Sequence, residues 1–159
     1  MLSFEVLPFD ALTNRQLHDL LRLRCDVFVV EQECAYPELD GRDMESWHLL
    51  GWDGGELVAY ARWYWDPERD PREPEGRVPT PGAMVLGRIA TALAVRRKGY
   101  GRRTVEASLE AIADAHPSVP IRIHAQERLE RFYQDFGFST LGEAFDEDGI
   151  QHLLMVRNA

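Results

Sequence analysis

The fold of this 159-residue chain is decided by one stretch, residues 89–102, with the sequence IATALAVRRKGYGR. It opens in an apolar segment, 83–94, which is broken only by Arg88 and Thr91 and is typical of a central strand covered on both faces. Glycines at 99 and 101 allow the next turn to be tight, so that successive N–H groups point into one concavity at the start of a helix. Such a turn binds phosphate.

Five cations surround this turn in a chain that is otherwise acidic, with 18 Lys and Arg against 27 Asp and Glu. They are Arg96, Arg97, Lys98, Arg102 and Arg103. Positive charge at a helix N-terminus opposes the helix dipole, so the cluster indicates a bound anion rather than a solvated basic helix start. The spacing fits neither a dinucleotide fingerprint, which needs a third glycine and a later acidic residue, nor a Walker A loop.

The composition sets the class of protein. At 45% hydrophobic and 28% charged residues, the chain is expected to form one soluble domain over 1–159. A net charge of −9 argues against nucleic acid and favours a cationic partner. No apolar run is long enough for a membrane and no secretion signal is visible, so we expect a cytoplasmic protein. Cys25 and Cys34 lack metal-site spacing, so we expect reduced thiols and no metal.

Working outward, the periodicity predicts the order β-α-β-β-β-α-β-α-β-β. Strands are expected at 3–6, 47–52, 56–65, 83–94, 121–126, 138–145 and 150–156, and helices at 14–31, from the turn to about 116, and at 127–136. Asp53-Gly54-Gly55 and Asp148-Gly149 predict hairpin turns. The segment 66–82 is rich in proline and charge, with Val78 as its lone aliphatic residue. It is expected to be an exposed, mobile loop, and we hypothesise that it covers an acceptor site.

The first helix carries two charges on its apolar stripe. Thr13 and Gln16 predict a capping box, and Arg24 falls on the same face as the leucines that follow. A charge there needs a partner. Two interpretations of Arg24 stay open, a structurally paired arginine and one that faces a ligand. Glu31, seven residues further on, is expected on the same buried stripe.

Two motifs resemble the GNAT superfamily of acetyl-CoA-dependent N-acetyltransferases. Arg96-x-x-Gly99-x-Gly101 resembles its R/Q-x-x-G-x-G/A signature, and QERLERFYQDFGF, 126–138, is similar to its late helix with Tyr133 before Gly-Phe. Gln126 stands where Asn is commoner. Further segments resemble the ElaA-like subfamily: 23–32, Tyr36-Pro37, Asp40-Gly41, Gly51-Trp52, 57–62, Gly87-Arg88 and 147–155. The resemblance implies an α/β fold with a mixed, mostly antiparallel sheet, splayed central strands and helices on both faces.

The resemblance also implies a reaction, the transfer of acetyl from acetyl-CoA to a primary amine by direct attack in a ternary complex. Tyr133 would be the general acid for the CoA thiolate, since a phenol and a thiol have similar pKa values. Its alternative role is packing beside Phe132 and Phe136. The implied cofactor residues are Ile89, Ala90 and Thr91 for the pantetheine arm, Arg96, Arg97, Lys98, Gly99, Tyr100, Gly101 and Arg102 for the pyrophosphate, and Gln126 and Tyr133.

The acceptor side is less determined. A base is needed because the attacking amine must be neutral. The candidates are Glu31, Glu38, Asp40, His48, His124 and His152, and Glu31 ranks first for its place on the buried stripe. Arg24, Glu38, Asp40 and His152 are the predicted acceptor residues, although 38–43 also fits a solvated turn.

Two alternatives to this enzyme stay open. Arg24, Phe28 and the acidic run Glu38-x-Asp40-x-x-Asp43 also resemble acyl-homoserine-lactone synthases, which use a sulfonium-bearing acceptor. A non-catalytic acyl-CoA sensor is the other alternative. The sequence does not determine the acceptor, which is a small-molecule or peptide amine, or the preferred acyl chain. It does not determine the oligomeric state either, and a homodimer is one of the possibilities.

Overall fold

A computed structural model describes residues 1–76, 80 and 82–159, which form two compact units. The first unit comprises Met1–Tyr64 and Gly87–Ala111, and the second comprises Trp65–Leu86 and Ile112–Ala159. The strands are β1 (Ser3–Pro8), β2 (Trp47–Asp53), β3 (Glu56–Asp66), β4 (Ala83–Thr91), β5 (Ile121–Gln126), β6 (Ser139–Glu147) and β7 (Ile150–Arg157). The helices are α1 (Asn14–Arg24), α2 (Tyr100–Ala115) and α3 (Glu130–Gln134).

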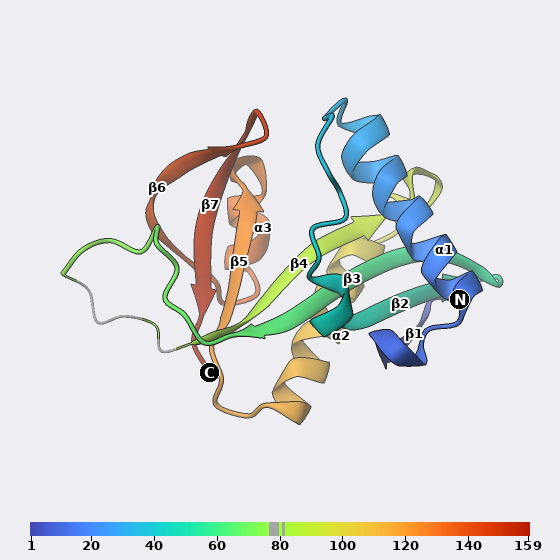
Figure 1. Cartoon of the computed structure of the whole chain (residues 1–159), viewed down its shortest axis with the longest axis horizontal. Helices are drawn as coiled ribbons and strands as arrows, with labels where there is room; N and C mark the ends of the chain where they lie inside the picture. The colour runs from blue at the N-terminus through green and yellow to red at the C-terminus, as the bar shows by residue number, and fades with distance from the viewer. Residues whose placement is uncertain (77–79, 81) are drawn as a thin grey trace. The chain divides into compact units, whose positions relative to one another are not determined.

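The predicted order of elements and the mixed α/β sheet are confirmed. Hydrogen-bonded neighbours give a seven-stranded sheet in the order β1-β2-β3-β4-β5-β7-β6 (Figure 1). β4 pairs with β5 in parallel over only two residue pairs, Met84 with Ile121 and Val85 with Arg122. The pairs β1–β2, β2–β3, β5–β7 and β6–β7 are antiparallel. None of the helices in the described part of the chain is long and apolar enough to cross a membrane.

The first predicted helix changes its hydrogen bonding halfway. The capping box of Thr13 and Gln16 is present at its start, but Cys25–Glu31 is π-helical. The β-branched valines of this segment favour an α-helix only weakly. A π-helical turn holds more residues than an α-helical one, so a spacing of seven no longer returns to the same face. The expectation for Glu31 is therefore wrong: it is exposed, whereas Arg24 is fully buried.

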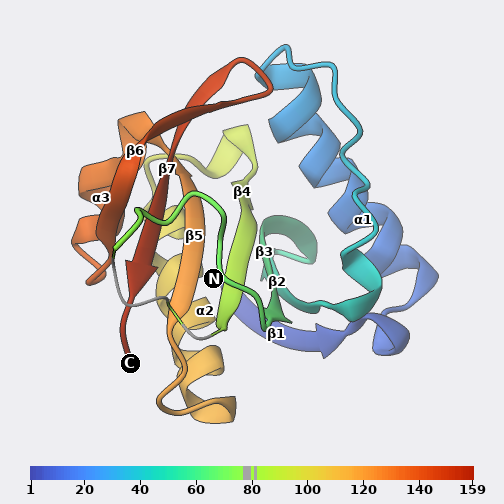
Figure 2. The same ribbon diagram turned by 60° about the vertical axis from the view of Figure 1, so that its left-hand side comes forward.

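The core of the first unit is built on both faces of β2 and β3. Leu50 and Tyr60 are paired across these strands and pack against Leu20 and Leu23 of α1. The opposite face carries Gly51 and its partner Ala59. Figures 1 and 2 show α1 on one side of these strands and the first part of α2 on the other. Each face is thus covered by one helix.

Both predicted hairpins are confirmed by their backbone geometry. Gly54 and Gly55 have φ values of 59° and 83°, and Asp148 and Gly149 have φ values of 53° and 82°. Two successive left-handed residues make a turn whose twist matches that of the flanking strands. The first turn joins β2 to β3, and the second joins β6 to β7.

The segment after β3 is exposed over most of its described residues, as predicted, but some of its polar side chains are buried. Asp70, Glu73 and Thr80 are buried, and the Arg122 side chain of β5 donates to the Glu68 carbonyl at 3.1 Å. Figure 2 shows this segment crossing in front of β5 and β7. Asp70 finds its partner His124 on β5, and Glu73 pairs with Arg69 and the Thr80 N–H of the same segment, contacts that composition alone does not reveal. Val78 lies outside the described residues, and the mobility of the loop stays a prediction.

One tight contact in the first unit predicts a stability effect. A Cβ added at Gly51 would lie 2.7 Å from the Ala59 Cβ and 2.9 Å from a Phe4 ring carbon. We therefore expect Gly51→Ala to lower the free energy of unfolding by about 1–3 kcal/mol, through overpacking. Gly87→Ala is the matched control, since a Cβ there meets nothing within 4 Å. Urea denaturation measures both, and equal stabilities of the two variants would contradict the packing described for β2 and β3.

Candidate active site

The candidate residues fall in both units, and each is described within its own. In the first unit, β4 is distorted at Arg88, whose φ of 51° is left-handed. A non-glycine residue in this conformation costs about 1–3 kcal/mol and marks places where a strand is re-aimed. The distortion comes directly before Ile89, Ala90 and Thr91, the residues predicted for the pantetheine arm. It is held by the Arg88 side chain, which donates to Glu38 at 3.0 Å.

Glu38 belongs to a network of three arginines and three carboxylates, all in the first unit. Arg24 donates to Glu38 Oε1 and to Asp43 Oδ1, each at 2.6 Å. Arg62 of β3 shares Asp43 at 2.7 Å and also binds Asp40. Since Arg24 is fully buried and Glu38 and Asp43 are nearly so, every charge must find its partner inside the protein.

The electrostatics of this arginine–carboxylate network favour the charged forms. Burial alone would lower the pKa of Arg24. The Tyr60 hydroxyl and the carboxylates of Asp43 and Glu38 outweigh burial, so the pKa of Arg24 is raised. Burial would likewise raise the pKa of Asp43, but its hydrogen bonds from Arg24 and Arg62 lower it. Of the two interpretations of Arg24, the structure therefore supports the structurally paired arginine over one that faces a ligand. Because Arg24 has no exposed atom, it cannot contact an acceptor directly and can only position the carboxylates that it binds.

A half-buried tyrosine and a fully buried histidine complete the network. Tyr36 donates to Glu38 Oε2 at 2.5 Å. His48 lies 2.7 Å from the Tyr60 hydroxyl through Nδ1 and 2.9 Å from the Asp43 carbonyl through Nε2. Burial lowers the pKa of His48, so it stays neutral. Both nitrogens of His48 are engaged, which gives this base candidate a structural role.

The turn predicted to bind phosphate lies between β4 and α2 in the first unit. Gly99 has a φ of 77°, and Arg97, at 65°, is also left-handed. Gly101 is not left-handed; it lies in the first turn of α2, and a Cβ there would project into open space. The first backbone N–H groups of a helix have no partner within it and favour an anion. Arg97, Lys98 and Arg102 are exposed around this turn.

Two side chains of the turn anchor it to the rest of the first unit. Arg96 binds both carboxylate oxygens of Glu31 and lies 3.3 Å from the Thr91 carbonyl. Tyr100 donates to Asp53 at 2.5 Å, which ties the start of α2 to the β2–β3 hairpin. A carboxylate with both oxygens on a guanidinium is a weak proton acceptor, so the geometry favours other base candidates over Glu31.

Tyr133 lies in the second unit, on α3, and is 7% exposed. Its ring makes edge contacts with Phe132 at 5.1 Å and Phe138 at 6.0 Å. Burial raises the pKa of Tyr133 to about 12, so the phenol keeps its proton at neutral pH. None of the hydrogen bonds found within residues 1–76, 80 and 82–159 uses its hydroxyl. The residue is thus a packed aromatic that retains a donor for a ligand.

The other predicted residues of the second unit lie on one face of its sheet. Gln126 of β5 is paired directly with His152 of β7. His152 is mostly buried, and its Nδ1 lies 2.8 Å from the Ile150 carbonyl. The acceptor residues predicted from the sequence are therefore divided, with Arg24, Glu38 and Asp40 in the first unit and His152 in the second.

Some residues of these arrangements were not predicted as site residues. Arg62 and Arg88 each interrupt a strand that is otherwise apolar, and this interruption is the signal that could have revealed them. Asp70 gives no such signal, because it stands among many other charges in 66–76. Its contact with His124, at 2.7 Å, depends on the tertiary structure.

Comparison with known proteins defines the class. The family model described as an acetyltransferase (GNAT) domain matches residues 29–159, and the chain belongs to this family of acyltransferases. The structure of an acyl-CoA N-acyltransferase from Pseudomonas aeruginosa has a TM-score of 0.85 and 34% identity, covering 99% of each chain. The acyl-homoserine lactone synthase BjaI, at 19% identity and a TM-score of 0.74 over 99% of this chain and 83% of its own, shares the fold alone.

Within this family the chain is an ElaA-like member. It is 39% identical to protein ElaA of Escherichia coli K12 over 159 residues, which is 99% of this chain and 97% of ElaA. The crystal structure of E. coli ElaA has a TM-score of 0.85, with 99% of this chain and 100% of that chain covered. The resemblance seen in the sequence motifs is confirmed.

The arginine–carboxylate network predicts a strong dependence of stability on Arg24. We expect Arg24→Met to lower the free energy of unfolding by about 3 kcal/mol, because it leaves two buried carboxylates with fewer cations. Arg24→Lys should restore little, since an ammonium cannot reproduce the two-pronged geometry. Urea denaturation provides the measurement. The control is Arg15→Met, which removes an exposed pair with Asp19 on the same helix. A loss no larger in Arg24→Met than in this control would show that the network is not stabilising.

Proposed function

We propose that the protein is an acetyl-CoA-dependent N-acetyltransferase that moves the acetyl group to a primary amine by direct attack in a ternary complex. Membership of the GNAT acyltransferases supports an acyl-CoA donor. The observation that carries the proposal is the turn that leads into α2. Gly99 is left-handed there, a Cβ at Gly101 would meet open space, and exposed cations surround both glycines. A CoA thioester brings the diphosphate that such a turn binds.

Each part of the turn has a task in this proposal. Backbone N–H groups across 97–102 hold the pyrophosphate, and Arg97, Lys98 and Arg102 add charge from outside. Arg96 is bound to Glu31 and is the cation whose partner would be exchanged or shared when the diphosphate arrives. Backbone groups of Ile89, Ala90 and Thr91 contact the pantetheine arm, with the distortion at Arg88 setting their direction. Gln126 is assigned to the cofactor through the family resemblance.

Tyr133 stabilises the departing thiolate in this mechanism. Since its pKa is raised to about 12 and that of a thiol is about 8.5, complete proton transfer from the phenol to the thiolate is unfavourable. The phenol instead donates a hydrogen bond while the C–S bond breaks. The proton that finally reaches the sulfur comes from the attacking nitrogen, which must lose it to become an amide.

The buried network weighs against a sulfonium-bearing acceptor. Glu38 and Asp43 are already neutralised by Arg24, Arg62 and Arg88, so they offer little net charge to a cation. Asp40 is also paired with Arg62 and Arg88, but its side chain is 31% exposed, so it is the carboxylate of this network that an acceptor can reach. The acceptors that we favour are therefore small-molecule or peptide amines, met in the cytoplasm.

The first test is acceptor-dependent release of CoA. We expect thiol release from acetyl-CoA with at least one pool of small amines, polyamines, amino acids or basic peptides. Tyr133→Phe should lower kcat about 10²-fold, because it removes the donor to the leaving thiolate, while the Kd for acetyl-CoA stays unchanged.

Tyr64→Phe is the control, since it removes a phenol from β3 outside the candidate residues. Its kcat should equal that of the unmodified protein. If acetyl-CoA binds but no pool gives release, the result favours the acyl-CoA sensor over transfer to any amine of these pools. Release that is equal in both variants would contradict the role of Tyr133.

A further inference from the structure

Four titratable side chains meet in the second unit, and the mechanism above does not use them as a group. They are Asp70 from the segment after β3, His124 of β5, Glu147 of β6 and His152 of β7. His124 Nε2 lies 2.7 Å from Asp70 Oδ2, and Nδ1 lies 3.8 Å from Glu147 Oε1. Glu147 is also 3.5 Å from His152 Nε2. His124 is therefore at the centre of the cluster.

This cluster lies on the same sheet face as Gln126, the residue of the second unit assigned to the cofactor. His124 and Gln126 are two apart on β5, so their side chains leave the strand on the same side. His152 is the direct partner of Gln126 in the register of β5 and β7. Cross-strand partners share a face as well. The histidines thus flank a position that the family resemblance assigns to the cofactor.

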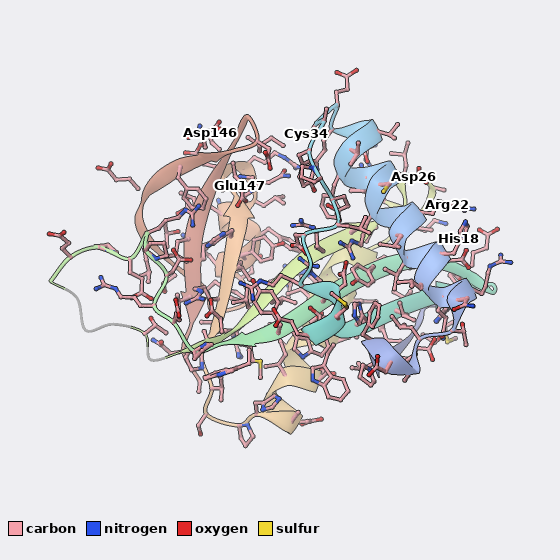
Figure 3. All side chains as sticks on the ribbon, viewed as in Figure 1. His18, Arg22, Asp26, Cys34, Asp146 and Glu147 are labelled. Atoms are coloured by element: carbon pink, nitrogen blue, oxygen red, sulfur yellow. The ribbon has the colours of Figure 1, made fainter. Side chains whose placement is uncertain are left out.

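The cluster runs from the interior to the surface. The Asp70 side chain is 6% exposed, that of His124 is 27% exposed and that of Glu147 is 40% exposed. Figure 3 places Glu147 at the β6–β7 hairpin. A cationic acceptor can reach this outer carboxylate from solvent, and a proton can pass inward to the ring of His124.

The geometry fixes which nitrogen of His124 can accept a proton. An ionised carboxylate only accepts hydrogen bonds, so Nε2 carries the hydrogen that points to Asp70. Nδ1, which faces Glu147 Oε1 at 3.8 Å, is then the acceptor of the neutral ring. The ring is fixed by an edge contact with Phe145 at 5.2 Å. This arrangement of an oriented imidazole backed by a buried carboxylate is that of a general base.

The surrounding charges tune this base. Burial alone would lower the pKa of His124, but Asp70 and Glu147 outweigh it and raise the pKa above the usual value. The hydrogen bond from His124 in turn lowers the pKa of Asp70 to about 2 against its burial, so Asp70 stays charged. A base is most effective when its pKa lies close to the working pH.

Two arginines also face the cluster. Arg122 lies 3.8 Å from Asp70 but is engaged by Asp66 at 2.5 Å. Arg72 lies 3.7 Å from Asp70 and 4.2 Å from the centre of the Phe145 ring. Neither arginine contacts His124 within the part of the chain that the structure describes. Asp70 is held by the His124 ring and by the backbone N–H of Arg72, which donates to Asp70 Oδ1 at 2.9 Å, and the imidazole is left as the proton acceptor.

We propose that His124 is the general base that deprotonates the acceptor, and that Glu147 binds the acceptor's ammonium group beside it. One proton moves from the ammonium to Nδ1 and then to solvent. The neutral nitrogen forms the C–N bond with the thioester carbon, the C–S bond breaks, and the second proton of the nitrogen ends on the CoA sulfur. Asp70 is a positioning residue that acts through His124. This inference rests on the proposed transfer to an amine.

The experiment is the pH dependence of kcat/KM for the acceptor, in the full-length protein. The unmodified protein should lose activity as the pH falls below the pKa of His124. We expect His124→Gln to lower kcat/KM about 10²-fold at pH 7 and to recover toward pH 10, where the amine itself is neutral. Asp70→Asn should move the acid limb to lower pH. His18→Gln, on α1 in the first unit, should leave the profile unchanged (Figure 3).

Two further measurements separate catalysis from folding. NMR titration of the His124 ring should give a pKa above 6.5 that falls in Asp70→Asn. Glu147→Gln, at a half-exposed position, should raise KM for the acceptor more than it lowers kcat. If the unmodified protein acetylates an amine and the His124→Gln variant shows the same pH dependence of kcat/KM, this inference is overturned and the proposed function stands. If no amine gives turnover in the unmodified protein, the proposed function fails and this inference fails with it.

Discussion

The first unit depends on the burial of Arg24. A guanidinium without contact to water must be matched by charges of its own protein, and Glu38 and Asp43 provide them at 2.6 Å each. These two carboxylates also bind Arg88 and Arg62, so α1, the loop after it, β3 and β4 are joined by one set of ion pairs. The left-handed conformation of Arg88 persists because its side chain is hydrogen-bonded to Glu38, a member of these ion pairs.

Arginine therefore serves two purposes in this unit. Arg24 and Arg62 are buried and saturated, and they contribute rigidity. Arg97 and Arg102 are exposed around the turn before α2, where backbone N–H groups and an open Gly101 leave room for an anion. The net charge of the chain does not distinguish these uses, whereas their positions relative to the strand and the turn do. The second unit contributes Tyr133, a hydrogen-bond donor, and the histidine–carboxylate cluster, which is suited to proton transfer.

Much of this organisation follows from local sequence. The hairpin glycines, the capping box of Thr13 and the turn at 96–102 are set by short-range conformational rules, and all three were predictable. The position of Glu31 was not, because the helix becomes π-helical after Arg24. The burial of Asp70 was not predictable either, because its partners Arg122 and His124 are more than fifty residues away. Long-range ion pairs leave no periodic signal in one sequence.

The central claim is that the turn before α2 binds the diphosphate of a CoA thioester. Calorimetric titration of acetyl-CoA into the unmodified protein and into Gly101→Val tests it most directly. A Cβ at this position has no neighbour within 4 Å outside the local helix backbone, so folding should be preserved, as thermal unfolding of the variant would check. The account predicts binding that is weakened at least about tenfold, or 1.4 kcal/mol, in the variant. Equal affinities, or no binding to the unmodified protein, would contradict it.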